Sequence, residues 1–284
     1  MSNPPHQPSD DTIIDLGTPA STTINFDPRA PVGASFAKNK IIVMSGKGGV
    51  GKSTVAANLA VSLALKGFKT GILDLDLTGP SIPKILGIEK EEPVSDPETK
   101  KLIPVPVMPN LVAMSLFYFI GVDKAVIWRG SMRFKAIQNF LSGVSWGKLD
   151  FLVMDLPPGT GDEPITVAQQ IPDPTGAVIV STPQTVATQD VKKSVFFAQK
   201  MNVPVLGIVE NMSGFNCPHC GEFVPIFGQF GAKKLSEEMN VPFLGFLPLK
   251  QDIAISGDSG KPFAPNSKEF ETLVSNLLDI IQNS

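Results

Sequence analysis

A glycine-rich segment between an apolar run and a helix-like run constrains this chain more than any other feature. Residues 46–54 read GKGGVGKST and match the pattern G-x-x-x-x-G-K-[ST]. They follow the β-branched apolar run 41–44 and precede the alanine- and leucine-rich run 55–65. Glycine lets the backbone approach closely, so successive N–H groups and the N-terminus of the next helix can cradle phosphate oxygens. The sequence therefore predicts a strand, a phosphate-binding loop and a helix, in that order.

The side chains of this loop are those of a nucleoside triphosphate site. We expect Lys52 to reach the β- and γ-phosphates, Ser53 to bind Mg²⁺ and Thr54 to contact the α-phosphate. The residues predicted to bind ATP in the loop are Gly46, Lys47, Gly48, Gly49, Val50, Gly51, Lys52, Ser53 and Thr54.

Short apolar runs alternate with longer helix-like stretches along the rest of the chain. The runs are 41–45, 70–74, 111–115, 150–155, 177–181, 205–209 and 243–247. This alternation predicts a doubly wound α/β fold, in which a mostly parallel sheet carries helices on both faces. One such domain accounts for residues 40–284. The proline-rich, charged segment 89–110 is expected to be a surface excursion, and the run 111–122 a buried strand followed by a turn.

Residues 1–39 are rich in Pro, Ser, Thr, Asp and Asn, which predicts a disordered tail. The tail lacks the apolar core of a signal peptide, and its acidic residues are atypical of a transit peptide, so we expect a cytoplasmic protein. The longest apolar run is shorter than the roughly 20 residues that cross a bilayer. The net charge of -3 gives no general attraction to nucleic acid. Neither a membrane nor a nucleic acid is therefore an expected partner.

Aspartates end two of the predicted strands. Asp74 and Asp76 close the strand 70–74, and Asp155 closes the strand 150–155. Ligands of open α/β sheets bind beyond the carboxyl ends of the strands, so these carboxylates are expected to face Mg²⁺ and water. Asp76 also precedes a Gly-Pro pair, and a role as a turn or N-cap residue is compatible with catalysis.

The two cysteines, Cys217 and Cys220, stand three positions apart, which lets both sulfurs face one metal. Two ligands do not complete a zinc site or an iron–sulfur cluster, and the sequence contains no further cysteine. A two-fold homodimer would supply the missing pair. Four thiolates suit a shared [4Fe-4S] cluster, and a shared zinc satisfies the same geometry.

The loop K-G-G-V-G-K-S-T resembles that of the MinD, ParA and nitrogenase iron-protein class of ATPases. This resemblance implies an ATP-dependent dimer in which Lys47 reaches the nucleotide of the partner subunit. The D-x-D-x-x-G-P-S motif is similar to the first switch of the class, which implies that Asp76 orients the attacking water. Asp155 resembles the Walker B aspartate that binds Mg²⁺, and Asn211 stands where the class binds the adenine edge. The catalytic residues implied are Lys47, Lys52 and Asp76.

The motifs together resemble the Mrp/ApbC family of iron–sulfur cluster carrier ATPases over residues from about 40 to the C-terminus. The further motifs are W-R-G-S-M at 128–132, D-x-P-P-G-T-G-D, E-N-M-S and C-P-H-C-G. The resemblance implies a slow ATPase that binds a [4Fe-4S] cluster at a dimer interface and transfers it to apo iron–sulfur proteins. His219 is expected to be an exposed spacer. The chain departs from the family at Ser131, where a proline is usual, and in having no accessory domain or N-terminal four-cysteine motif.

The alternative is a MinD- or ParA-like positioning ATPase with a structural zinc at the two cysteines. Anchoring of the MinD kind needs a basic amphipathic C-terminal helix, whereas segment 267–284 has three acidic residues and one lysine. Its apolar residues Phe270, Leu273 and Leu277, with Ile280 and Ile281, have helical spacing and predict a helix packed on the domain. A metabolic kinase or synthetase ranks last, because no acceptor site is identified.

Overall fold

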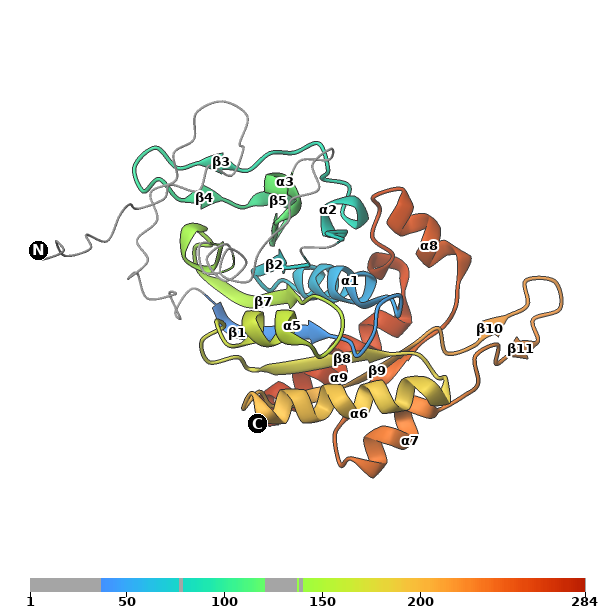
Figure 1. Ribbon diagram of the computed structural model, residues 1–284. Helices are drawn as coiled ribbons and strands as arrows, with labels where there is room; N and C mark the ends of the chain where they lie inside the picture. Colours follow the sequence, from blue (N-terminus) through green and yellow to red (C-terminus); the bar gives the residue numbers. More distant parts are fainter. Residues whose placement is uncertain (1–36, 77–78, 121–136, 138–139, 284) are drawn as a thin grey trace, which may run out of the picture.

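One eight-stranded sheet runs through the computed structural model of the chain, which describes residues 37–76, 79–120, 137 and 140–283 (Figure 1). Its strands are β1 (Ala37–Met44), β2 (Thr70–Asp74), β5 (Val105–Met108), β6 (Leu111–Ser115), β7 (Leu149–Asp155), β8 (Gly176–Ser181), β9 (Val205–Asn211) and β12 (Phe243–Leu247). They lie in the order β12-β9-β8-β1-β7-β2-β6-β5, and every neighbouring pair is parallel except β5 and β6. The predicted mostly parallel α/β sheet is confirmed.

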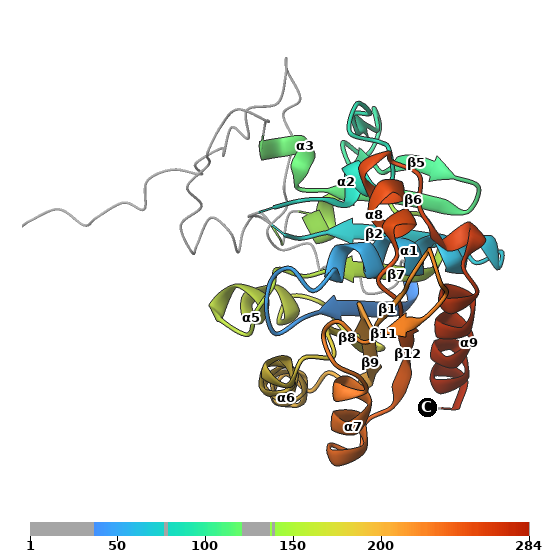
Figure 2. The same cartoon turned by 90° about the vertical axis from the view of Figure 1, so that its right-hand side faces the viewer.

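Helices cover both faces of this sheet (Figure 2). One face carries α1 (Lys52–Leu65) and α9 (Lys268–Asn283), which also contact each other. The other face carries α5 (Asp162–Ala168), α6 (Thr185–Lys200) and α7 (Gly231–Glu238). The short helices are α2 (Ile82–Ile85), α3 (Phe117–Ile120), α8 (Gln251–Asp258) and the 3-10 turn η1 (Ala264–Asn266). Helices on both faces make the fold doubly wound, as predicted.

Helix α1 is rich in alanine and leucine, which lose little entropy in a helix. Their side chains are apolar, and the helix is buried along most of its length. It begins at Lys52, three residues before the expected start, directly after Gly51 with φ 82°. It ends where Gly67 adopts φ 90°, and Phe68 N donates to the carbonyl oxygen of Leu63 at 3.2 Å. The glycines at its two ends therefore set the limits of the helix.

The segment 89–110 is more than a surface excursion. It contains the hairpin strands β3 (Val94–Ser95) and β4 (Leu102–Ile103), and its last part is β5, which extends the main sheet. Pro106 lies within β5 and pairs with Val112. Proline has no N–H to donate, and an edge strand tolerates this because its outer side needs no partner. After β6 the chain forms α3, where the sequence suggested a turn.

Both ends of the domain are defined by packing. Strand β1 begins at Ala37, whose partner is Leu149, so residues 37–39 belong to the sheet and not to the expected tail. The rest of that tail, residues 1–36, lies outside the described residues. At the other end, Phe270, Leu273 and Leu277 of α9 are completely buried, which confirms the predicted packed helix. In the described ranges, no helix is both long enough and apolar enough to cross a membrane.

Candidate nucleotide and thiol sites

The parallel sheet brings the predicted nucleotide-binding residues together at one edge. Strands β1, β2, β7 and β9 point the same way, so the segments that follow them meet beyond their carboxyl ends. Asp155 at the end of β7 is in register with Val43 on β1 and with Asp74 on β2. The phosphate loop leaves β1 beside this aspartate.

The loop forms one wall of a cleft of about 280 Å³. Its lining residues are Ser45, Lys47, Gly48, Gly49, Gly51, Lys52, Ser53, Thr54, Asp76, Ser81, Ile85 and Pro158. Seven of these belong to the predicted ATP-binding loop. Gly46 lies behind the cleft, where a Cβ atom would come within 2.4 Å of the carbonyl oxygen of Asp190 on α6. Only glycine fits at this position, so α6 fixes the path by which the loop leaves β1.

At the floor of the cleft, a buried lysine, a serine and an aspartate are linked. Lys52 Nζ lies 2.7 Å from Asp155 Oδ1, and Ser53 Oγ donates to Asp155 Oδ2 at 2.5 Å. Burial raises the pKa of the Asp155 carboxyl, and the charge of Lys52 opposes the rise. Hard oxygen ligands suit Mg²⁺, and Ser53 Oγ and Asp155 are within reach of one such ion. The donor set therefore fits Mg²⁺.

Asp76 also lines the cleft. Its Oδ2 is 4.0 Å from Lys52 Nζ, and its Oδ1 accepts a hydrogen bond from Gly79 N at 3.3 Å. The carboxylate thus has the turn role considered from the sequence while also facing the cleft. Residues 77–78 of the same motif lie outside the described residues.

The second lysine of the loop, Lys47, also lines the cleft and is half-buried. Its carbonyl oxygen accepts a hydrogen bond from Ser45 Oγ at 2.9 Å, which fixes the backbone at this point. The Lys47 backbone is thus fixed beside the cleft, and the residue is less buried than Lys52.

Asn211 lies against the phosphate loop. Its Nδ2 donates to the carbonyl oxygen of Val50 at 2.9 Å, and a Cβ atom on Gly51 would approach this nitrogen to 2.3 Å. The side chain is buried, and it braces the loop at Val50, two residues before the start of α1. This contact was not anticipated from the sequence, which suggested only an adenine contact.

The two cysteines lie at the tip of a small hairpin formed by β10 (Phe215–Asn216) and β11 (Phe223–Val224), which projects from the body of the domain (Figure 1). Cys217 N donates to the carbonyl oxygen of Glu222 at 2.8 Å, and Gly221 N donates to that of Cys217 at 2.8 Å. Cys217 is half-buried and Cys220 is exposed, and neither is in a disulfide. The hairpin therefore presents two free thiols outward.

The turn between the cysteines favours the thiolate form of Cys217. The backbone N–H groups of Cys220 and His219 and the thiol of Cys220 donate to the Cys217 sulfur, which lowers its pKa. Thiolate is the form that binds metals. Within the segments that the structure describes, no group of three or more His, Cys, Asp or Glu side chains could hold a metal ion. Among the described residues, the two thiols therefore have no further side chains to complete a metal site.

Comparison with protein families decides the class of this molecule. The family model described as ParA: NUBPL iron-transfer P-loop NTPase matches residues 36–283. The chain belongs to this family of iron-transfer P-loop NTPases. Its phosphate loop, sheet and helices are accordingly those of a P-loop NTPase.

Two curated proteins and a solved structure are similar to this chain over most of their length. An iron–sulfur cluster carrier protein of Methanocaldococcus jannaschii is 46% identical over 250 residues, covering 86% of each chain. The cytosolic Fe-S cluster assembly factor CFD1 of Saccharomyces cerevisiae is 48% identical over 219 residues, covering 75% of this chain and 74% of its own. Among solved structures, a nucleotide-binding protein of Archaeoglobus fulgidus in complex with ADP has a TM-score of 0.73 and 41% identity, covering 83% of this chain and 91% of that one.

Two buried carboxylates of this family member, Asp74 and Glu210, make structural contacts that the sequence did not predict. Asp74 Oδ2 accepts hydrogen bonds from Ser115 Oγ at 3.0 Å and from Ile82 N at 3.2 Å, so it ties β2 to β6 and to α2. Burial, together with the charge of Asp155, raises the pKa of Asp74 to about 7. Glu210, beside Asn211, is the second. The D-x-D and E-N patterns contain both residues, but only the tertiary contacts distinguish the two acids from their neighbours.

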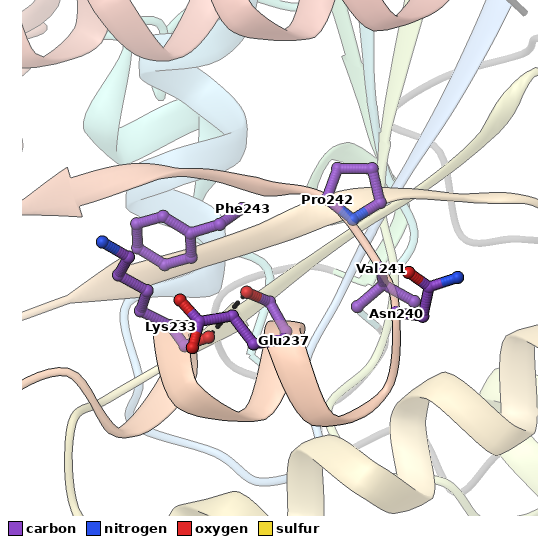
Figure 3. Close-up of a pocket in the computed structure, with 7 residues that line it drawn as sticks. Lys233, Glu237, Asn240, Val241, Pro242 and Phe243 are labelled. Atoms are coloured by element: carbon purple, nitrogen blue, oxygen red, sulfur yellow. Dashed lines mark hydrogen bonds between the residues drawn. The ribbon is translucent and has the colours of Figure 1, made fainter.

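A second hollow, of about 390 Å³, lies between α7 and β12 (Figure 3). It is lined by Lys233, Ser236, Glu237, Asn240, Val241, Pro242 and Phe243. Ser236 Oγ donates to the carbonyl oxygen of Lys233 at 2.7 Å. The hollow lies at the amino end of β12, at the sheet edge opposite the phosphate loop, so it is separate from the nucleotide site. The W-R-G-S-M motif at 128–132 lies outside the described residues.

Proposed function

We propose that this protein is a slow ATPase that forms a homodimer, binds a [4Fe-4S] cluster at the dimer interface and transfers the cluster to apo iron–sulfur proteins. The observation that carries the proposal is the pair Cys217 and Cys220, presented outward on a hairpin of a P-loop NTPase. Relatives named as iron–sulfur cluster carrier and Fe-S cluster assembly factor support the same role.

The ligand count supports a homodimer. Iron–sulfur clusters of the [4Fe-4S] type are held by four thiolates, and each chain has two cysteines. A two-fold axis through the hairpin tips would bring two identical thiol pairs together. Zinc bound by the same four sulfurs is the fallback assignment.

Apolar side chains around the thiols support contact with a second copy. Phe223, Val224 and Ile226 are 46%, 40% and 51% exposed, and they lie three, four and six residues after Cys220. Exposed apolar side chains gathered at one place are typical of interaction sites. When covered by the partner hairpin, they would exclude water from the cluster.

The cleft supports the chemistry of ATP hydrolysis. Lys52 would bind the β- and γ-phosphates, Ser53 and Asp155 would hold Mg²⁺, and Asp76 would orient the attacking water. Mg²⁺ neutralises phosphate charge when it is bound. Lys47, which lines the cleft, would reach the nucleotide of the partner subunit, and Asn211 would contact the adenine edge. Turnover is expected to be slow because the nucleotide acts as a conformational switch.

The ATPase assignment is tested by measuring phosphate release with Lys52→Ala and Asp76→Ala. Each substitution removes a group that faces the cleft, so turnover should fall to the background rate. ATP turnover at the wild-type rate in either variant would remove that residue from the mechanism.

The cluster assignment is tested by reconstitution without oxygen. The wild-type protein is expected to bind four iron and four sulfide per dimer, with the visible absorption of a [4Fe-4S] cluster. The Cys217→Ala/Cys220→Ala double variant should bind neither, whereas His219→Ala should load normally because His219 is a spacer. Normal iron loading by the double variant would refute the proposal, and zinc without iron in the purified protein would favour the fallback.

The second candidate is a MinD- or ParA-like positioning ATPase, because the phosphate loop K-G-G-V-G-K-S-T resembles that of this class. The first turn of α9 carries Glu269 and Glu271, which would be repelled by anionic lipid, and its apolar face is occupied by the domain core. We therefore propose a cytoplasmic protein without a membrane or nucleic-acid partner, in line with the cytosolic relative. Recruitment to anionic liposomes or to DNA by Mg-ATP would instead support the positioning role.

A further inference from the structure

A single buried carboxylate joins the two ends of the segment that carries the thiols. Glu210 is fully buried near the end of β9. Its Oε1 accepts a hydrogen bond from Ser213 Oγ at 2.5 Å, just before the hairpin. Its Oε2 accepts one from Ala232 N at 2.8 Å, in the first turn of α7 just after the hairpin. The carboxylate thus contacts Ser213 and Ala232 at once, and these two residues are the roots of the thiol-bearing segment 213–232.

The next residue along the strand faces the nucleotide site. Successive side chains of a strand point to opposite sides, so Glu210 and Asn211 face different neighbours. Asn211 Nδ2 donates to the Val50 carbonyl oxygen in the phosphate loop, as described above. Two adjacent residues of one strand therefore contact the phosphate loop and both roots of the thiol hairpin.

The backbone at both roots adopts conformations that ordinary residues avoid. Met212 has φ 57° and Phe230 has φ 60°, although neither is glycine. Such conformations persist only where surrounding contacts impose them, and they cluster at switch regions. On the first root, Ser213 N donates to the carbonyl oxygen of Leu247 at 2.9 Å. On the second, the Phe230 ring lies edge-on against Phe246, with centroids 5.5 Å apart. Both roots therefore contact β12 as well as Glu210.

We propose that Glu210 is a positioning residue that couples the nucleotide loop to the thiol hairpin. A shift of the loop at Val50 is passed through Asn211 to the end of β9, and Glu210 then moves Ser213 and Ala232 together. Nucleotide in the cleft thereby changes the orientation of Cys217 and Cys220 and their affinity for metal. This inference rests on the proposed function, because it requires that the cleft binds ATP and that the thiols bind metal.

The coupling is measured with the full-length protein, without oxygen, by titrating Zn²⁺ against a competing chelator with and without a non-hydrolysable Mg-ATP analogue. Coupling between two sites typically changes affinity about 5- to 150-fold, and it acts in both directions. We expect a change in this range for the wild-type protein. In Glu210→Gln the amide keeps the shape of the side chain but loses its charge and one acceptor oxygen. The charge-assisted hydrogen bonds to both roots are therefore weakened, and Ser213 Oγ can only accept from the new NH₂ group.

The expected result for Glu210→Gln is a coupling factor that falls to within about twofold of unity. The affinity for the analogue alone and for Zn²⁺ alone should stay within about twofold of wild type, which separates positioning from a general loss of structure. The control is Glu237→Gln, the same chemical change on the exposed side of α7, which should keep the wild-type coupling. An unchanged coupling factor in Glu210→Gln, or no coupling in the wild-type protein, would overturn the inference.

Two further measurements keep the test decisive. If Glu210→Gln does not fold, Ser213→Ala removes only the contact at the first root and should reduce the coupling by an intermediate amount. The rate of thiol alkylation by iodoacetamide, with and without the analogue, reports the hairpin without any metal. If the wild-type protein binds no metal, the proposed function fails, yet an alkylation rate that depends on nucleotide in wild type and not in Glu210→Gln would still support the coupling. Equal alkylation responses in the two proteins would refute it.

Discussion

Lys52 Nζ and Asp155 Oδ1 lie 2.7 Å apart at the floor of the phosphate cleft, and both side chains are almost completely shielded from water. The two residues come from the start of α1 and the end of β7, 103 positions apart in the sequence. Their charges compensate each other where neither would be tolerated alone. The same pair therefore links the stability of the domain to the residues that would bind phosphate and Mg²⁺.

Breaking this buried pair is predicted to destabilise the domain more than breaking an exposed pair on the same strand. Asp155→Asn leaves the charge of Lys52 buried, so the free energy of unfolding should fall by about 3 kcal/mol, the low end for breaking a buried pair. The low end applies because Asp76 Oδ2 still lies 4.0 Å from Lys52 Nζ. Asp150→Asn is the control on the same strand, since its pair with Lys38 is exposed and should be worth at most about 1 kcal/mol. Urea denaturation measures both, and equal losses would contradict the prediction.

Lys47 is predicted to act in turnover without being needed for nucleotide binding. If it reaches the nucleotide of the partner subunit, Lys47→Ala should lower ATP turnover about 100-fold or more, as for loss of a trans-acting cationic finger. The affinity for ATP should change less than about threefold, because Lys52 and the loop amides remain. Phosphate release and equilibrium dialysis separate the two effects. Lys66→Ala, at the far end of α1, should leave both unchanged, and a loss of affinity matching the loss of turnover in Lys47→Ala would argue against a role across the dimer.

The phosphate loop is predicted to tolerate alanine at one glycine and not at another. Gly51 has φ 82°, and a Cβ atom there would lie 2.3 Å from Asn211 Nδ2. Gly51→Ala should therefore lower the free energy of unfolding by about 1–2 kcal/mol from the backbone alone, and by more if Asn211 is displaced. Gly48→Ala should cost less than about 0.5 kcal/mol, since no atom lies within 4 Å of the new Cβ. Thermal denaturation without nucleotide tests both, and similar melting temperatures for the two variants would count against this account.

The ion pair between Lys250 at the start of α8 and Glu269 at the start of α9 is predicted to make stability depend on pH. Burial alone would raise the pKa of Glu269, but hydrogen bonds from Lys250 and Ser267 outweigh it and hold the pKa below the usual range. A lowered pKa in the folded state stabilises the protein above the unfolded value of about 4.3, and this contribution is lost as the pH falls through the folded pKa.

Glu269→Gln should therefore lower the free energy of unfolding by about 0.5–1 kcal/mol at pH 7 and by almost nothing near pH 3, a modest effect because the Lys250–Glu269 pair is partly exposed. Glu271→Gln, in the same first turn, controls for the helix dipole and should show a smaller loss. Urea denaturation at several pH values tests the prediction. A difference between Glu269→Gln and wild type that persists unchanged to pH 3 would exclude the ionic origin.

Much of the fold was predictable because its signals are local. The seven predicted apolar runs are strands, and the C-terminal periodicity is a packed helix. The limits of prediction are equally physical. Proline in the segment 89–110 suggested an excursion, yet Pro106 is accommodated in β5 because that strand lies at the sheet edge.

By itself, the sequence determined the phosphate loop and the two-thiol motif, since each consists of a few adjacent residues whose chemistry depends on residue type and spacing. Only the tertiary structure decided how these parts are connected. Asn211 meets Val50 across 161 positions, and Glu210 meets Ala232 across 22, and neither contact leaves a trace in local periodicity. Burial converts these side chains from ordinary polar residues into fixed ones, because a buried polar group must keep its hydrogen bonds. That requirement fixes Asn211 against the nucleotide loop and the adjacent Glu210 against the roots of the thiol hairpin.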